Sequence, residues 1–480
     1  MKKNVLLNDI LIYGLNNVLG KVISIFTIPI YTRLFNEAQF GVMDTISISI
    51  SMVSIFINLG IDMAIQRYYF LYEKNQNKRD VISTPFYYLL FWGALVVLGL
   101  CLLSDDLSLL LFKSSIYSKI IRLATISSFL NMVLNFCLNI LRLYFNPARY
   151  TFISTLKNLG SAIFSLVFIM VFKMGITGFF LGSLAIELLL LFPAIGSIKG
   201  DLILHFDLKL LKSMLRYGIP FVPASLAYWI FNFSDRIMIS RLVNLNEVGL
   251  YGIANRFVSI LSFFIAAFSK AWVPRAFNRY KESPDSFNAY INTTQLYITT
   301  FFCILSLYLS VFSKELLTIL VAQQFVKSYK AIQILAIGMV AHALSYSGAI
   351  GIYISKDTRF ISFYSWVSAI TNIVLNLLFI PYLGMIGAAI TTTISYFVLF
   401  IGYAITSERL MNWYIEKKGI FSLVFVTTIF IMLGNLVEFN SFYLTILGKF
   451  IYSLLYFIVL RFLGLFNLVE VIKLVKGTKQ

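Results

Sequence analysis

Charged side chains are scarce in this sequence. Asp, Glu, Lys and Arg make up only 12% of the 480 residues, whereas 59% are hydrophobic. A soluble globular chain carries about 25% charged residues, and so few charges would not cover the surface of a soluble domain of this size. The composition therefore excludes an ordinary soluble protein and indicates that most of the surface faces lipid.

Cysteine and histidine are also rare. The three cysteines (Cys101, Cys137 and Cys303) lie far apart in apolar runs, without CxxC spacing. The two histidines, His205 and His342, are too few to complete a zinc site with them. We therefore predict no metal site and no cofactor, and interpret the cysteines as small apolar fillers.

Acidic residues are outnumbered: 39 Lys and Arg face 21 Asp and Glu, for a net charge of +18. In a soluble protein this excess would suggest nucleic acid as a partner. In a membrane protein basic residues gather in cytoplasmic loops, so we predict no nucleic-acid binding. Met1 leads through two lysines into an apolar run without a small-residue cleavage pattern, which we interpret as a retained helix rather than a signal peptide.

Long apolar runs account for most of the chain. A membrane-spanning helix needs about 20 predominantly apolar residues, and this criterion predicts about fourteen spans. They lie near residues 9–33, 40–62, 82–103, 118–142, 150–172, 176–198, 217–241, 248–270, 290–312, 329–354, 360–380, 384–406, 419–436 and 442–463.

Basic residues in the loops predict the orientation of these spans. With the N-terminus inside, the cytoplasmic segments hold 25 Lys and Arg and the opposite loops hold 8. This bias predicts that both termini are cytoplasmic and that the protein is a multi-pass protein of the bacterial inner membrane. All predicted loops are short, so there is no room for a soluble catalytic domain on either face.

An internal repeat divides the chain. Residues 32–43 (TRLFNEAQFGVM) align without gaps on residues 240–251 (SRLVNLNEVGLY), and Gly175–Gly178 (GITG) match Gly384–Gly387 (GMIG) at nearly the same offset. Six spans separate the copies, so the halves share one topology. We predict an all-α fold of two pseudo-symmetric six-helix lobes, 1–206 and 207–415, followed by two further helices and a cytoplasmic tail in 416–480. Such paired lobes are typical of transporters that work by alternating access.

Polar residues recur at steps of three or four within several spans, which places them on one face of each helix. Isolated serines often serve only to pack helices. Continuous polar faces of this kind, here called polar seams, occur in both halves and favour a hydrated cavity. The residues that we predict to line it are Ser47, Ser51, Ser54, Asn58, Asn131, Asn135, Asn139, Asn232, Asn255 and Ser259.

Charges inside the spans are the strongest functional signal, because each costs at least about 2.5–3.5 kcal/mol at mid-bilayer unless it is paired or hydrated. Cations predominate among them, which suits a substrate that carries phosphate or carboxylate groups. The predicted substrate-binding cations inside the spans are Lys21, Arg122, Lys157, Arg236 and Arg256, and the candidate carboxylates for H⁺ or Na⁺ coupling are Asp62, Glu187 and Asp235.

Three segments carry a family resemblance: IPIYTRLFNEAQFG near the start, RYGIPFVPASLAYWIFNFSDRIMISRLVNLNEVGLYGIANRF in the middle, and NIVLNLLFIPYLGMIGAAITTTISY in the second half. They resemble the Wzx-type polysaccharide flippases, which belong to the superfamily that also holds the multidrug-extruding MATE proteins and the lipid II flippases. The likeness covers about residues 5–410, and the motif at Ser234, Asp235 and Arg236 is its most specific part. The likeness also implies a substrate-binding role for Arg33, which lies in a loop.

The resemblance implies a MATE-like fold and the translocation of an undecaprenyl-pyrophosphate-linked oligosaccharide for O-antigen, capsule or another surface polysaccharide. It also implies a polysaccharide polymerase and a chain-length regulator as partners. Two alternatives stay open: a multidrug or lipid II exporter of the same superfamily, and a membrane polymerase or ligase. The basic bias argues against a drug exporter, and the short outer loops argue against an enzyme.

Overall fold

The structure is a computed structural model that describes residues 20, 23, 26–72 and 78–464. Within these ranges every regular element is a helix, which confirms the predicted all-α fold. A helix satisfies its own backbone hydrogen bonds, as an apolar solvent demands. Eleven of the described helices are long and apolar enough to cross a membrane. The number fourteen stays a prediction, and the first predicted span, 9–33, lies mostly outside the described residues.

The chain forms two compact units, 1–229 with 244–248 and 230–243 with 249–480. The elements of the first are α2 (Glu37–Asn58), α3 (Ile61–Leu71), α4 (Asp80–Leu102), α5 (Ser104–Phe112), α6 (Ser118–Leu143), α7 (Pro147–Met170), α8 (Gly175–Ile198), η2 (Lys199–Asp201), α9 (Leu208–Gly218), η3 (Ile219–Phe221) and the start of α10 (Val222–Leu242). The predicted lobe boundaries at 206 and 415 stay predictions.

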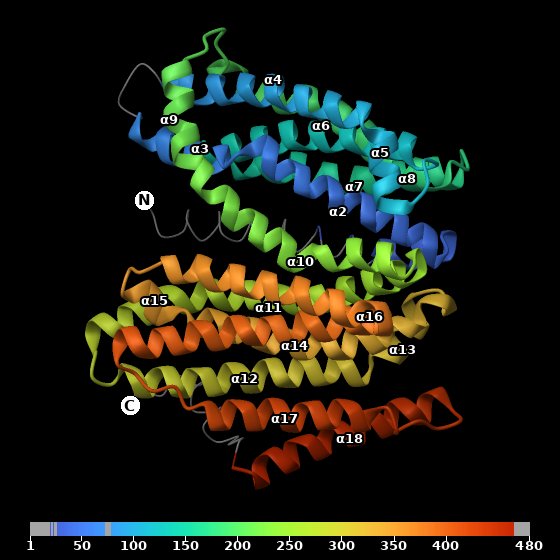
Figure 1. Ribbon diagram of the computed structural model, residues 1–480, viewed down its shortest axis with the longest axis vertical. Helices are drawn as coiled ribbons and strands as arrows, with labels where there is room; N and C mark the ends of the chain where they lie inside the picture. The colour runs from blue at the N-terminus through green and yellow to red at the C-terminus, as the bar shows by residue number, and fades with distance from the viewer. Residues whose placement is uncertain (1–19, 21–22, 24–25, 73–77, 465–480) are drawn as a thin grey trace. The chain divides into compact units, whose positions relative to one another are not determined.

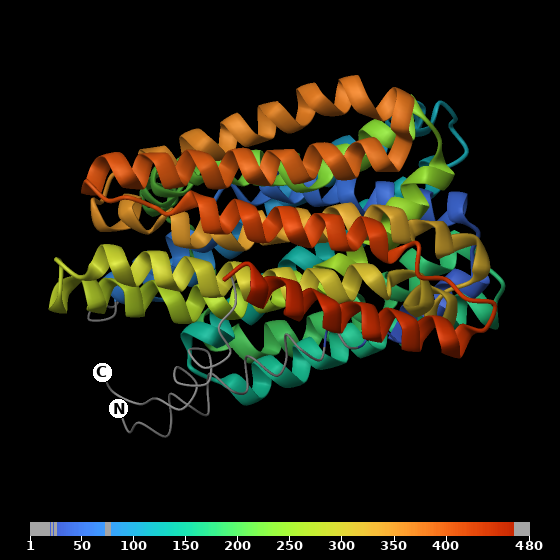
Figure 2. The same cartoon turned by 90° about the horizontal axis from the view of Figure 1, so that it is seen from below.

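The second unit contains the rest of α10 and the helices that follow it. These are α11 (Leu245–Glu282), α12 (Phe287–Val311), α13 (Ser313–Leu320), η4 (Gln323–Ser328), α14 (Tyr329–Gly348), α15 (Ile350–Ile354), α16 (Arg359–Met411), α17 (Lys417–Gly434) and α18 (Phe442–Phe462). Figure 1 shows α17 and α18 (red) beside α12 (yellow), and Figure 2 shows the same two helices next to each other from below.

Glycine permits the closest helix packing in the first unit. A Cβ atom on Gly182 of α8 would lie 2.2 Å from the backbone nitrogen of Ser165 on α7, and the Ser165 hydroxyl donates to the Phe179 carbonyl at 2.8 Å. Small residues that let two backbones approach in this way are the usual means of helix association in membranes. They bring α7 and α8 together beside α6.

Several helices run further than the predicted spans. The span predicted at 40–62 is interrupted by Leu59 (φ 45°) and Gly60 (φ 76°) and continues as α3 to Leu71. α11 extends twelve residues past the predicted end at 270. The predicted spans 360–380 and 384–406 both lie in α16, within which Gly384 has a non-helical backbone (φ 57°). Charged residues end the apolar run that defines a predicted span, but they do not end the helix. The predicted ends of these helices therefore lie before the observed ones.

The internal repeat is visible in local backbone structure. Asn36 caps α2 by accepting from the Gln39 amide at 2.8 Å, and Asn244 accepts from the Glu247 amide at 2.9 Å before α11. Gly175 and Gly384, the first glycines of the two matched tetrapeptides, share a positive φ of 53° and 57°. The aligned segments therefore have the same caps and turns.

Candidate functional site

A chain of polar contacts lies between α6, α7 and α8 in the first unit, buried at Glu187 and exposed at Asn135. Glu187 on α8, 4% exposed, accepts from Ser127 at 2.6 Å and from Asn131 at 2.7 Å. The Asn131 oxygen accepts from Asn135 at 2.6 Å, and the Asn135 oxygen accepts from the Lys157 ammonium at 3.0 Å. These five residues, the Glu187 network, link one carboxylate and one ammonium through two amides. Asn131 and Asn135, which we predicted to lie on one polar face of the fourth span, therefore share a network with two of the predicted charges, Glu187 and Lys157.

Asp62 forms a second polar group of the same unit, at the start of α3. Asn58 donates to its carboxylate at 2.5 Å and accepts from its backbone amide at 3.2 Å. Asn139 and Arg142 of α6 also interact with the Asp62 carboxylate. The break at Leu59 and Gly60 places Asn58 at the end of one helix and Asp62 in the first turn of the next, where a carboxylate is favoured.

A polar cavity of about 210 Å³ opens between these two groups. Its lining comes from α2, α3, α4 and α6, so the seams predicted on the second and fourth spans face the same space. The residues that line it are Ser54, Asn58, Ile61, Asp62, Leu89, Ser128, Asn131, Met132, Asn135 and Phe136.

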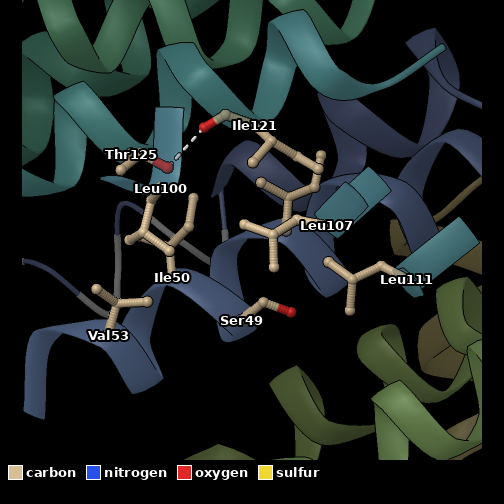
Figure 3. Close-up of a pocket in the computed structure, with 9 residues that line it drawn as sticks. Ser49, Ile50, Val53, Leu100, Leu107, Leu111, Ile121 and Thr125 are labelled. Atoms are coloured by element: carbon tan, nitrogen blue, oxygen red, sulfur yellow. Dashed lines mark hydrogen bonds between the residues drawn. The ribbon is translucent and has the colours of Figure 1, made fainter. Parts of the chain in front are cut away.

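A smaller pocket of the same unit has a different character. It encloses about 60 Å³ between α2, α4, α5 and α6 and is lined almost wholly by aliphatic side chains such as Ile50, Leu100 and Leu107 (Figure 3). The Thr125 hydroxyl at its edge is bonded to the Ile121 carbonyl at 2.8 Å. The first unit therefore keeps its larger polar cavity apart from an apolar one.

Ser47, Ser51 and Ser54 on α2 are bonded mainly to their own helix. Their hydroxyls donate to the carbonyls of Met43, Ile48 and Ile50. Ser51 also accepts from the Trp229 indole at 2.9 Å. Of the three, Ser54 lines the polar cavity.

The second unit has a buried polar network of its own around Asp235 on α10. The Tyr251 hydroxyl donates to the Asp235 carboxylate at 2.5 Å and lies 3.5 Å from the Thr392 hydroxyl. Asn372 donates to Thr392 at 3.3 Å, and Asn376 donates to Asn372 at 2.9 Å. These five residues are the Asp235 network, which joins α10 and α11 to both halves of α16.

Two of the predicted cations belong to the second unit, and one of them, Arg236, lies beside that network. Arg236, 7% exposed, has its guanidinium carbon 5.8 Å from the Tyr251 ring centre and 5.5 Å from that of Phe233. Arg256 is half-buried on α11, one turn before Ser259, whose hydroxyl donates to the Arg256 carbonyl. Arg236 thus combines charge next to a carboxylate with cation–π contacts.

Two further predicted residues of this unit flank the network. Asn232 accepts from the Tyr396 hydroxyl at 3.3 Å, and Asn255 donates to the Tyr251 carbonyl at 3.0 Å. His342 stacks on the Tyr396 ring with 4.6 Å between ring centres.

Of the remaining predicted cations, Arg33 and Arg122 lie away from both networks, and Lys21 is not described. Lys21 lies outside the described residues, so the structure gives it no position. Arg33 is exposed just before α2. Arg122 is bonded to Asp105 at 3.0 Å and to Ser104 at 2.5 Å, which ties α6 to α5. Its charge is therefore paired with a neighbouring helix.

Sequence reasoning missed several partners in these networks. Ser127, Tyr251 and Thr392 are essential contacts, yet lone hydroxyl residues are common in membrane helices and gave no separate signal. Lys449 of α18 was also missed: it is 1% exposed and lies 2.7 Å from Glu315 of α13. A mid-span lysine in an apolar run is itself a signal, and it marks a buried ion pair here. Among the described residues no cluster of His, Cys, Asp and Glu has metal-site geometry.

Apolar helices that carry buried ionisable networks define a multi-pass membrane protein. The chain belongs to the polysaccharide biosynthesis protein family, whose sequence profile matches residues 30–330. It is 26% identical over 245 residues to an uncharacterized membrane protein of Methanocaldococcus jannaschii, with 48% of each chain covered, so it spans about half the length of that relative.

Two solved structures share the fold. The first is the lipid II flippase MurJ in an inward closed conformation, with TM-score 0.74 and 14% identity over 95% of this chain and 99% of that chain. The second is an inward-facing multidrug resistance MATE family transporter of the MOP superfamily, with TM-score 0.67 and 15% identity over 83% and 94%. These likenesses confirm the predicted MATE-like fold.

Proposed function

We propose that this protein is a flippase that translocates undecaprenyl-pyrophosphate-linked oligosaccharide repeat units across the bacterial inner membrane by alternating access. The observation that carries the proposal is the combination of family and fold. The family is named for polysaccharide biosynthesis, and the fold matches a lipid II flippase over nearly the full length of both chains. A polysaccharide built on a lipid carrier needs a protein that moves the carrier-linked unit between leaflets.

The intramembrane polar groups support a hydrophilic cargo. Side chains such as Asp62, Glu187 and Asp235 lie within or at the start of apolar helices, where an unpaired charge is costly. A purely structural bundle gains little from them. A transporter that moves sugar hydroxyl groups and a diphosphate through the membrane needs such groups along the path.

Cationic side chains are the proposed partners of the diphosphate. Arg236 and Arg256 are buried or half-buried within spans, and Lys21 is assigned the same role from its sequence position. An arginine binds phosphate oxygens in a bidentate manner. The polyprenyl tail would stay in lipid.

We propose that the carboxylates of Asp62, Glu187 and Asp235 couple transport to a gradient of H⁺ or Na⁺. In the Glu187 and Asp235 networks the carboxylate is surrounded by hydroxyl and amide donors within a buried site. Gain of a proton or a sodium ion changes the charge of such a site, and the change alters the packing energy of the helices around it. The energy of an ion gradient is thereby passed to the conformational cycle.

A multidrug exporter is the second candidate, because the MATE transporter shares the fold. Such an exporter of cationic drugs needs an acidic or aromatic pocket that is free of nearby cations. Lys157 is linked to Glu187 through Asn135 and Asn131, and Arg236 lies beside Asp235. Their positive charge opposes the binding of a cationic drug.

The decisive experiment locates lipid-linked repeat units in a strain that lacks this protein. A sugar-modifying enzyme that cannot cross the inner membrane is added to spheroplasts. Flipping predicts that full-length units accumulate but stay inaccessible, and that the wild-type protein restores access. Units that are accessible yet unpolymerised would instead support an enzyme, and unchanged polysaccharide with altered drug susceptibility would support the exporter.

A further inference from the structure

The polar cavity of the first unit has room for a ligand much larger than one water molecule. It encloses about 210 Å³, whereas one water molecule occupies about 30 Å³ in the liquid. A bare monovalent cation is smaller than a water molecule and would leave most of this volume unfilled. One six-membered sugar ring with its hydroxyl groups matches the size.

The lining combines the two surfaces that a sugar presents. Asn58, Asp62 and Asn131 provide amide and carboxylate groups, which suit sugar hydroxyl groups. Leu89 and Phe136 provide an apolar wall, which suits the C–H face of a pyranose. A metal ion has no need of the apolar surface.

The amides are also held in fixed orientations before any ligand arrives. Asn131 uses its oxygen to accept from Asn135 and one N–H to donate to Glu187. Asn135 likewise accepts from Lys157 and donates to Asn131. Each amide nitrogen has two N–H groups, so each has a second donor for a ligand hydroxyl. Fixed orientation lowers the entropy cost of binding.

The charge of the lining selects among sugars. Asp62 is the one carboxylate among the lining residues, and none of them is a cation. The nearby cations Arg142 and Lys157 are already engaged, Arg142 with the Asp62 carboxylate and Lys157 with the Asn135 oxygen. A sugar acid would bring a second negative charge into the cavity, whereas a neutral sugar would donate its hydroxyl protons to Asp62. The site therefore disfavours uronic and sialic acids.

We propose that this cavity binds one neutral pyranose residue, a hexose or N-acetylhexosamine, of the lipid-linked oligosaccharide. The inference rests on the proposed flippase function and adds a sugar subsite within the first unit. The diphosphate is held by other residues, so its binding does not depend on this cavity.

The test compares short-chain substrate analogues on the purified full-length protein in detergent. The probes are farnesyl diphosphate and its conjugates with a neutral hexose, an N-acetylhexosamine and a uronic acid, and calorimetry gives each Kd. The wild-type protein is expected to bind at least one neutral conjugate about tenfold or more tightly than farnesyl diphosphate, a ratio worth about 1.4 kcal/mol. The uronic acid conjugate is expected to gain nothing.

Two variants separate the cavity from general damage. Ser128→Leu and Ser54→Leu each fill the cavity without breaking a hydrogen bond of the Glu187 network. Both are expected to lose the preference for the neutral conjugate while the Kd for farnesyl diphosphate stays unchanged. Ser197→Leu, at the far end of α8 and outside the cavity, is the control and is expected to keep the preference.

The outcomes distinguish this inference from the proposed function. If farnesyl diphosphate binds but the wild-type protein has no preference for any neutral conjugate, or if Ser128→Leu keeps the preference, the sugar subsite is wrong and the flippase proposal stands. If sodium alone raises the melting temperature and both variants abolish that shift, the cavity is an ion site, which also overturns the inference. If no probe binds, both proposals fail.

Discussion

At the scale of single residues, one buried ion pair of the described chain allows a direct stability test. Lys449 and Glu315 are 1% and 6% exposed and lie 2.7 Å apart. Loss of one member leaves the other charge buried and uncompensated, which costs about 3–5 kcal/mol. Replacement of both by apolar residues of similar size is often neutral. The pair therefore makes a clear stability prediction.

We expect Lys449→Met to lower the thermal unfolding temperature of the purified protein markedly. The double variant Lys449→Met with Glu315→Leu is expected to recover most of the loss, because no charge is then left in the interface between α18 and α13. The matched control is Lys314→Met, which breaks the exposed pair with Glu438 and is expected to cost less than about 1 kcal/mol. Equal losses in all three proteins would contradict this account.

Glu187 provides the second prediction at this scale. Glu187→Gln keeps the size of the side chain and can still accept from Asn131, but it cannot exchange a proton or hold a sodium ion as a carboxylate does. We expect the variant to reach the membrane in normal amounts and to lose most flipping, by tenfold or more, together with any dependence of flipping on the ion gradient. Ser161→Ala, which breaks the Ser161–Ser183 contact in the same unit, is the control. Gradient-dependent flipping in Glu187→Gln would remove Glu187 from the coupling residues.

The sequence could identify one side of most of these contacts but not the other. Asn131, Asn135 and Glu187 stand out because amides and carboxylates are rare in apolar helices. Ser127, the partner of Glu187, and Tyr251, the partner of Asp235, do not stand out, because hydroxyl residues occur throughout such helices. Pairing depends on helix rotation and tilt, which hydrophobic packing sets and a hydropathy pattern does not record.

At the scale of elements, the break between α2 and α3 is held by a contact between two glycines. Gly60 has φ 76°, and a Cβ atom there would lie 2.2 Å from the Gly218 carbonyl oxygen at the end of α9. A Cβ on Gly218 would in turn lie 2.7 Å from the Leu59 oxygen. The contact fixes where α3 departs from α2, and hence the position of Asp62.

We expect Gly60→Ala to destabilise the protein, because it adds left-handed backbone strain and a backbone clash, each worth about 1–3 kcal/mol. Gly99→Ala on α4 is the control, since its Cβ would meet nothing within 4 Å and alanine favours a helix. Thermal unfolding and yield in the membrane fraction measure both. An unchanged unfolding temperature in Gly60→Ala would show that α2, α3 and α9 shift freely.

The segment between α8 and α9 is tied to the start of α4. Its backbone amides at Ile203 and Asp207 donate to the hydroxyls of Ser83 and Thr84. His205 lies 2.7 Å from the Asp80 carboxylate, and this hydrogen bond and charge hold the pKa of His205 above its ordinary value. The contact is therefore strongest when the imidazole is protonated.

This arrangement predicts a pH-dependent segment. The contribution of His205 is complete below the unfolded-chain pKa of about 6.5 and is lost as the pH rises through the raised folded pKa. After correction for intrinsic rates, hydrogen exchange at residues 203 and 207 is expected to be faster at pH 8.5 than at pH 6. His205→Gln is expected to remove this difference. The same pH dependence in the variant would assign it to another group.

Hydropathy predicts where helices lie better than where they end. The predicted spans at 118–142, 176–198 and 442–463 agree closely with α6, α8 and α18. The ends of α3 and α11 differ because polar and charged residues continue the helix beyond the apolar run. The break between α2 and α3 was not predicted, because the apolar run continues through Leu59 and Gly60 to Ile61.

At the scale of the whole molecule, the repeat was predictable because it depends on local backbone chemistry. An asparagine cap and a left-handed glycine have the same physical role wherever they occur, so Asn36 and Asn244, and Gly175 and Gly384, keep both identity and conformation. The buried polar networks of the two units differ in their residues. Asn131 and Glu187 accordingly have no matching residues in the Asp235 network.

The orientation in the membrane is the prediction on which the direction of transport depends. The 25-to-8 bias in loop Lys and Arg places residues 270–289 and 355–359 inside and the loops near Lys113 and Lys327 outside. Exposed positions suitable for cysteine reporters occur on both sides: Ser286 and Thr358 inside, Ser115 and Gln323 outside. The three native cysteines are replaced first.

We expect a membrane-impermeant maleimide to label Ser115→Cys and Gln323→Cys in intact spheroplasts. Ser286→Cys and Thr358→Cys are expected to react only after the membrane is opened. The reverse pattern would place both termini outside, and the polar cavity would then have to be reached by its sugar from the other leaflet. If one reporter from each predicted side were labelled, those two positions would lie on the same side of the membrane. An even number of spans would then separate them where we predict an odd number, and the span prediction would need revision between them.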